Sequence, residues 1–155
     1  MGRNSWATRA PDHSVQIPFN EAADPKSQIQ EFIDLHRGPG VQHLALRVKN
    51  IIETLDVATP EAAGLFSFLT IPDTYYELVS KRFTIQESFE ELSRLRILVD
   101  QDDKGGYLLQ IFTNVLFGGF FFEVIQREGN EGFGEGNFTA LFESMELDQK
   151  RRGVI

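Results

Sequence analysis

Cysteine is absent from the sequence, and histidine and tryptophan are scarce, with three and one residues respectively. The absence of cysteine excludes disulfides, thiolate metal sites and a cysteine nucleophile, and it fits a reducing compartment. Long apolar runs are missing too, since no stretch approaches the roughly 18 residues of a membrane-spanning helix. The polar residues 1–9 lack a signal-peptide core. We therefore expect a cytoplasmic protein without a membrane partner.

Positive charge is in short supply, because 15 basic residues face 23 acidic ones, which gives a net charge of −8. This charge repels phosphate backbones, so nucleic acid is not expected as a partner. The 155 residues do contain 41% hydrophobic side chains, enough for one packed domain. Eight of the 14 phenylalanines lie between Phe112 and Phe142. Packing alone does not require such crowding, so we expect an aromatic-lined cavity there.

Apolar periodicity and capping residues predict the order of the secondary-structure elements. Asn50 and Glu53 form a capping box that opens a helix, and Thr74 and Thr84 each begin a similar pattern. Asn137 is expected to cap the last helix. The remaining predicted elements are strands at 14–20, 41–48, 65–69 and 120–127, a helix that starts at Asp24-Pro25, and a β-hairpin from 96–100 and 107–113.

This order predicts an α+β chain that forms a single domain over residues 1–155. From residue 41 onward the elements follow a βαβββ-like module with a helical insertion and a C-terminal helix, built on a half-open mixed sheet. Residues 1–40 supply only one strand and one helix, so they are interpreted as the remnant of a preceding module.

His43 is the best candidate for a metal ligand, because it lies in the middle of an apolar strand. A polar ring in that position is either hydrogen-bonded in the core or coordinating a metal, and the pattern leaves both open. An iron site of the two-histidine, one-carboxylate type needs a second histidine and an acidic residue. His13 in a turn and His36 at a helix end are most simply solvated.

Glu123 is the only charged side chain in the apolar run 120–125. Burying it without a partner costs several kcal/mol, so it either faces outward, pairs with Arg127 or binds a metal. Strand alternation places Phe121 and Glu123 on one face of their strand, and Gln110 and Phe112 on one face of the preceding strand. These side chains would form an aromatic-walled pocket that holds a carboxylate and an amide.

Seven segments, in order, resemble the C-terminal part of 4-hydroxyphenylpyruvate dioxygenase, and residues 147–155 resemble its shorter bacterial type. The segments are IPFNE (17–21), KSQIQEF (26–32), GVQHLAL (40–46), ILVD (97–100), LLQIFT (108–113), FEVIQR (122–127) and GFGEGNF (132–138). The resemblance implies a vicinal-oxygen-chelate (glyoxalase-like) fold and a non-haem Fe(II) cofactor. The implied reaction converts 4-hydroxyphenylpyruvate and O₂ to homogentisate and CO₂ in tyrosine breakdown.

By this resemblance, His43 and Glu123 match two of the three iron ligands of the family. Four polar residues match catalytic positions: Ser5, Asn20, Gln42 and Gln110. A further set matches substrate-binding positions: Pro18, Gln28, Leu98, Phe112, Phe121, Phe133, Asn137, Phe138 and Leu141. Enzymes of this family are usually dimers or tetramers, so a homo-oligomer is expected.

The family's first histidine ligand lies upstream of the Ser5 region, in segments that this sequence does not contain. We therefore expect the 155-residue chain alone to be catalytically impaired. Two alternatives stay open at this point. Hydroxymandelate synthase shares the substrate and the iron, although Ser5, Pro18, Asn20 and Phe121 favour the dioxygenase. A truncated binding or assembly module would retain the fold without enzymatic activity.

Overall fold

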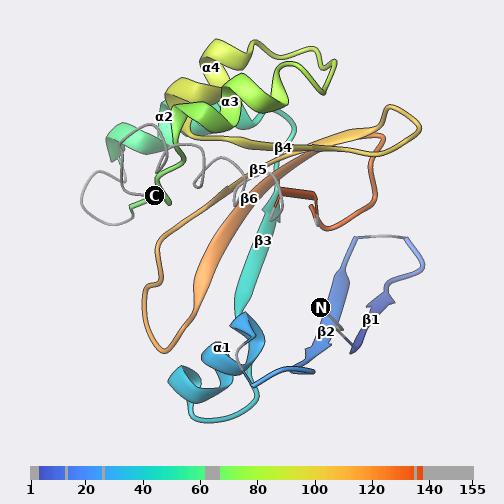
Figure 1. Cartoon of the computed structure of the whole chain (residues 1–155), viewed down its shortest axis with the longest axis vertical. Coiled ribbons are helices and arrows are strands. Elements are labelled where there is room, and N and C mark those ends of the chain that lie inside the picture. The colour runs from blue at the N-terminus through green and yellow to red at the C-terminus, as the bar shows by residue number, and fades with distance from the viewer. Residues whose placement is uncertain (1–3, 13, 26, 62–66, 135, 138–155) are drawn as a thin grey trace. The chain divides into compact units, whose positions relative to one another are not determined.

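The computed structural model describes residues 4–12, 14–25, 27–61, 67–134 and 136–137. Its contacts divide the chain into two compact units (Figure 1). Unit 1 comprises Met1–Gln42 and Val115–Phe120, and unit 2 comprises His43–Asn114 and Phe121–Ile155. The boundary expected at residue 40 between a remnant and a complete module stays a prediction.

Unit 1 contains a two-stranded antiparallel sheet of β1 (Asn4–Arg9) and β2 (Gln16–Glu21). The residue pattern predicts only the second of these strands. Strand β1 consists mainly of polar residues and therefore lacks the alternation that marks a half-buried strand. Strand β1 is stabilised by its pairing with β2. Across this pair, Trp6 stacks on Phe19 with ring centroids 5.7 Å apart.

Helix α1 (Gln28–His36) completes the regular structure of unit 1. The side chain of Ser27 accepts a hydrogen bond from the Gln30 N–H, so Ser27 is the N-cap and the expected start at Asp24-Pro25 is wrong. Phe32 of this helix packs against Gly119, which has a φ of +84°. A Cβ at Gly119 would lie 2.8 Å from the Phe32 ring, so only glycine fits this turn.

Unit 2 is built on a mixed four-stranded sheet in the order β3-β6-β5-β4. Strand β3 (His43–Arg47) runs parallel to β6 (Phe121–Glu128), which is antiparallel to β5 (Tyr107–Phe112). Strand β5 pairs in turn with β4 (Leu98–Gln101) as the predicted hairpin. The parallel pair joins segments far apart in the sequence, and the helices lie in the connection between them.

Helices α2 (Ile51–Glu61), α3 (Asp73–Val79) and α4 (Phe89–Leu95) gather on one side of this sheet (Figure 1). Asn50 caps α2 as predicted, because its side chain accepts a hydrogen bond from the Glu53 N–H at 3.0 Å, which is one of the two bonds of a capping box. The core lies between these helices and the sheet. Its buried side chains include Ile51, Leu55, Tyr75, Val79, Leu92, Val99, Leu109 and Ile111.

Three expected elements of unit 2 differ in the structure. Helix α4 begins after Ser88, which caps it, and not at Thr84. The reason is that Thr84 exchanges hydrogen bonds with the Gln101 side chain, and these hold its main chain away from the helix. The strand expected at 65–69 lies partly outside the described residues, and Phe68 forms only an isolated bridge with Thr113. Helix α3 is capped by Pro72 without a side-chain hydrogen bond, so Thr74 does not cap it.

No helix among the residues described here is long and apolar enough to cross a membrane.

Replacing Leu109 in β5 by alanine should lower the free energy of unfolding of the chain by about 2–5 kcal/mol. Leu109 is 0% exposed within the core, so its truncation removes apolar contacts and leaves a cavity. Leu44→Ala in β3 is the matched control, because Leu44 is 50% exposed, and it should cost about 1 kcal/mol or less. Urea denaturation followed by circular dichroism measures both values. Equal losses in the two variants would contradict the position assigned to the core.

Candidate metal centre

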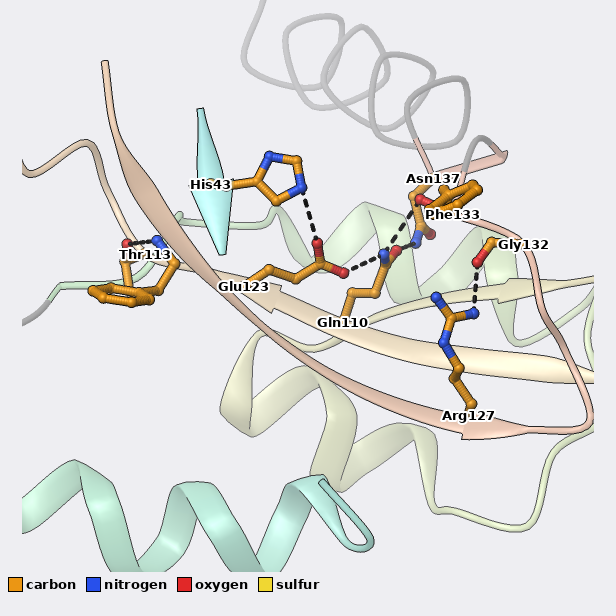
Figure 2. A network of polar contacts seen from close by, with 9 residues as sticks. His43, Gln110, Thr113, Glu123, Arg127, Gly132, Phe133 and Asn137 are labelled. Carbon is orange, nitrogen blue, oxygen red and sulfur yellow. Dashed lines mark hydrogen bonds and ion pairs between the residues drawn. The ribbon is translucent and has the colours of Figure 1, made fainter. Parts of the chain in front are cut away.

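Strands β3, β5 and β6 place a set of polar and aromatic side chains on the face of the sheet opposite α2, α3 and α4 (Figure 2). His43 lies opposite Phe121 in the β3–β6 register, and Phe112 lies opposite Glu123 in the β5–β6 register. Residues that are directly opposite share a face of the sheet. The pairing of the strands therefore places Phe112, Phe121 and Glu123 on one face of the sheet, as strand alternation predicts.

His43 and Glu123 point toward each other across β3 and β6 (Figure 2). The distance from His43 Nε2 to Glu123 Oε2 is 3.6 Å, which is too long for a good hydrogen bond. Metal–nitrogen and metal–oxygen bonds are each about 2.0–2.2 Å long, so one ion can contact both atoms. Glu123 is 5% exposed. The outward-facing alternative for this carboxylate is therefore wrong.

The second carboxylate oxygen of Glu123 is held by Gln110. The Gln110 Nε2 donates to Glu123 Oε1 at 2.6 Å, and the Gln110 Oε1 accepts from Asn137 Nδ2 at 2.7 Å. Gln110 is 1% exposed. A Cβ at Gly134 would lie 2.0 Å from Gln110 Oε1, and Gly134 has a φ of +74°, so only glycine lets the main chain lie this close to the amide here.

Burial shifts the protonation of both candidate ligands. Desolvation lowers the pKa of His43 below its usual 6.5, which favours the neutral ring, the form of imidazole that binds metals. Desolvation also raises the pKa of Glu123, although the hydrogen bond from Gln110 and the charge of Arg127 oppose this shift. A bound cation would favour the ionised carboxylate further.

Aromatic rings form the walls beside these two groups. The His43 ring stacks on Phe121 with centroids 5.0 Å apart and an interplanar angle of 15°. Phe112 meets Phe121 edge to face at 6.1 Å. Phe133 lies on the loop beside Gln110, whose amide also reaches the Phe133 carbonyl oxygen at 3.4 Å. A flat aromatic molecule would find complementary surfaces on these rings.

Arg127 and His36 contact other groups in the structure. The Arg127 guanidinium, considered as a partner for Glu123, donates to the carbonyl oxygens of Asn130 and Gly132. His36 stacks on Phe32 within unit 1. His13 lies outside the described residues. Within the described part of the chain, no cluster of three or more histidine, aspartate or glutamate side chains could hold a metal. Among these residues the candidate ligands brought together are the pair His43 and Glu123.

The remaining predicted site residues fall into three groups. Leu98 in β4 is buried opposite Gln110, next to the centre. Unit 1 contains Ser5, whose hydroxyl donates to the Asn20 side chain at 2.7 Å, as well as Pro18 in β2, Gln28 at the start of α1, and Gln42 before β3. Phe138 and Leu141 lie outside the described residues.

Two features of the centre depart from the sequence analysis. Asn137 was expected as a helix cap, but it is already helical, is 4% exposed and donates its side-chain amide to Gln110. Tyr75 was not predicted to take part at all, and its hydroxyl donates to the Asn137 Oδ1 at 2.9 Å. Its position in a helical capping pattern gives no signal of this contact, because the partner lies far away in the sequence.

Comparison with known proteins shows close similarity over almost the whole chain, although no family model matches it. The chain is 51% identical to hemolysin VllY of Vibrio vulnificus and 49% identical to 4-hydroxyphenylpyruvate dioxygenase of Pseudomonas aeruginosa. Each alignment covers 99% of this chain and 43% of the relative. A solved triple variant of 4-hydroxymandelate synthase from Streptomyces coelicolor matches with a TM-score of 0.73 at 35% identity, over 92% of this chain and 41% of that one.

These similarities confirm the resemblance to 4-hydroxyphenylpyruvate dioxygenases that the sequence motifs indicate. They also confirm the predicted fold class, an α+β chain with a mixed sheet of the vicinal-oxygen-chelate type. The chain spans less than half the length of the curated relatives that it matches.

In the metal-free chain, His43 should titrate below pH 6.5, because burial disfavours its charged form more than the neighbouring carboxylate favours it. The sign follows from linkage: the stability contributed by the neutral ring is present above pH 6.5 and is lost as pH falls through the lower folded pKa. An NMR titration of the ring protons, assigned with His43→Asn, measures this value. A pKa at or above 6.5 would show that the Glu123 charge outweighs burial.

Proposed function

We propose that this chain forms the iron-binding, C-terminal part of the catalytic domain of a 4-hydroxyphenylpyruvate dioxygenase. The enzyme would convert 4-hydroxyphenylpyruvate and O₂ to homogentisate and CO₂, a step of tyrosine and phenylalanine breakdown. The observation that supports this most is the pair His43 and Glu123, which face each other at 3.6 Å between aromatic walls. The 49% identity to a protein of that name supports it independently. The cytoplasmic location and the homo-oligomer predicted from the sequence are part of the same proposal.

The two donors fit a ferrous ion in type and position. One imidazole nitrogen and one carboxylate oxygen are two-thirds of the set found in two-histidine, one-carboxylate iron sites. Both lie on neighbouring strands of one sheet, which fixes them rigidly. When bound, Fe(II) would supply the reaction with oxygen that no side chain here can perform. A third protein ligand would have to come from outside the described residues.

The protein's own groups would bind and orient the substrate and exclude water. Gln110 holds one oxygen of Glu123 at 2.6 Å, which leaves the other oxygen directed at His43. Phe112 and Phe121 would contact the phenol ring, and burial on these rings favours a flat aromatic substrate over an aliphatic one. The polar residues Ser5, Asn20, Gln28 and Gln42 would bind the phenol or the keto acid, as their match to the family's motifs implies.

Hydroxymandelate synthase remains the nearest enzymatic alternative, since a solved structure of that name matches the chain at 35% identity. Proteins named 4-hydroxyphenylpyruvate dioxygenase match at higher identity, from 46% to 49% for bacterial relatives, and this favours the dioxygenase. The two enzymes give different products from one substrate, so chromatography of the products formed by the full-length protein separates them.

Glu123→Ala should weaken Fe(II) binding at least tenfold, because it removes one of two protein ligands. Anaerobic Fe(II) titration of the purified chain by calorimetry measures the dissociation constant. Glu90→Ala, which removes an exposed carboxylate from α4, is the control and should bind as the unmodified chain does. Identical Fe(II) binding by all three proteins would contradict the proposed centre and favour the non-enzymatic binding or assembly module.

The 155-residue chain on its own should form little homogentisate, because two protein ligands hold iron less firmly than three. Anaerobic loading with Fe(II), followed by addition of 4-hydroxyphenylpyruvate and O₂ and quantification of homogentisate by chromatography, tests this expectation. Robust turnover by the isolated chain would show that a third ligand from elsewhere is unnecessary.

A further inference from the structure

Tyr75 of α3 carries a hydroxyl group deep inside unit 2. The residue is 0% exposed, and its oxygen accepts a hydrogen bond from the Val99 N–H of β4 at 2.9 Å. The same hydroxyl lies 2.9 Å from the Asn137 Oδ1 and 3.1 Å from the Val99 carbonyl oxygen. A phenol has one proton to donate, so these two acceptors compete for it.

From Tyr75 the hydrogen bonds continue without a break to the candidate metal ligand. Asn137 donates to Gln110 at 2.7 Å, and Gln110 donates to Glu123 at 2.6 Å (Figure 2). The three amide and carboxylate side chains are each at most 5% exposed. This buried series, which we call the Tyr75 relay, consists of Tyr75, Asn137, Gln110 and Glu123.

The two ends of the Tyr75 relay decide which way its amides face. A side-chain amide fits its site either way round, and only its partners distinguish the oxygen from the nitrogen. At one end, the Val99 N–H can only donate, so the Tyr75 oxygen accepts and its proton is available to Asn137. At the other end, the ionised Glu123 only accepts. With its amide reversed, Gln110 would place an oxygen 2.6 Å from a carboxylate oxygen.

We propose that Tyr75 is a positioning residue that fixes the amide orientations of Asn137 and Gln110 and so keeps a donor directed at Glu123. The relay itself stands on the contacts above, and its consequence for a metal rests on the proposed function of Glu123. Groups that orient metal ligands through hydrogen bonds typically change metal affinity about 10- to 100-fold when they are removed.

The hydroxyl, and not the ring, is the part of Tyr75 that does this. A phenylalanine at this position would keep the packing but leave the Asn137 Oδ1 and the Val99 N–H buried without their present partner. Asn137 would then lose the contact that distinguishes its two orientations. Gln110 would in turn lose the defined donor that keeps its oxygen away from Glu123.

The neighbouring Tyr76 provides a matched control. It is 5% exposed, and its ring meets Tyr75 edge to face at 5.1 Å. Among the described residues its buried hydroxyl has no hydrogen-bond partner. Tyr76→Phe therefore removes the same atom from an adjacent buried ring of the same helix and leaves the Tyr75 relay intact.

The test compares Tyr75→Phe with Tyr76→Phe in the metal-free chain and then in Fe(II) titrations. Side-chain amide signals of Gln110 and Asn137 are assigned in nitrogen–proton NMR spectra by their loss in Gln110→Glu and Asn137→Asp. We expect Tyr75→Phe to shift or broaden both signals and to weaken Fe(II) binding about tenfold or more. Tyr76→Phe should leave the signals and the affinity unchanged.

Unchanged amide signals in a folded Tyr75→Phe chain would overturn the proposal, and so would altered signals with unaltered Fe(II) affinity. If Tyr75→Phe fails to fold, Asn137→Asp replaces it, since this variant keeps an oxygen toward Tyr75 but loses the donor to Gln110. Failure of the unmodified chain to bind Fe(II) would instead count against the proposed function. In that case the NMR comparison in the metal-free chain still decides whether Tyr75 orients the amides.

Discussion

The hydrogen bond from Gln110 to Glu123 is the interaction on which the rest of the centre depends. A carboxylate within an apolar strand is tolerable only if its charge is compensated, because burial without a partner costs several kcal/mol. Gln110 supplies this compensation for one oxygen only, at 2.6 Å, and the other oxygen faces the neutral ring of His43. The charge of Arg127 favours the ionised carboxylate from a greater distance, and a cation held between Glu123 and His43, as proposed, would favour it further.

The sheet separates stability from function by its two faces. One face packs against α2, α3 and α4 and carries the core, while the other carries the polar and aromatic groups of the centre. Alternation along β5 assigns neighbouring residues to opposite roles, since Leu109 and Ile111 are core residues and Gln110 serves the site. A shift of one residue in the register of β5 would exchange these roles, so the pairing with β6 protects both.

Local patterns in the sequence predict a good part of this arrangement. Alternation alone places Gln110, Phe112, Phe121 and Glu123 on one face of the sheet, and the cap predicted at Asn50 marks the start of α2 correctly. Strand β1 and the start of α4 are missed, because pairing with β2 and side-chain bonds from Gln101 override weak local signals. Tyr75 is missed for a different reason, since its partners Val99 and Asn137 are brought to it only by the tertiary fold.

The parallel pairing of β3 with β6 also bears on how the centre comes into being. Hairpin contacts between β4, β5 and β6 close short loops, whereas the β3–β6 pair closes a long one that contains α2, α3 and α4. Long-range pairing of this kind is slow, because loop-closure entropy opposes it until the contacts are made. A sheet in which β4, β5 and β6 have paired but β3 has not yet joined carries the Glu123 carboxylate without the His43 imidazole. If the centre binds Fe(II) as proposed, the ion would bind the finished architecture and not its precursors, and it would shift the folding equilibrium toward completion.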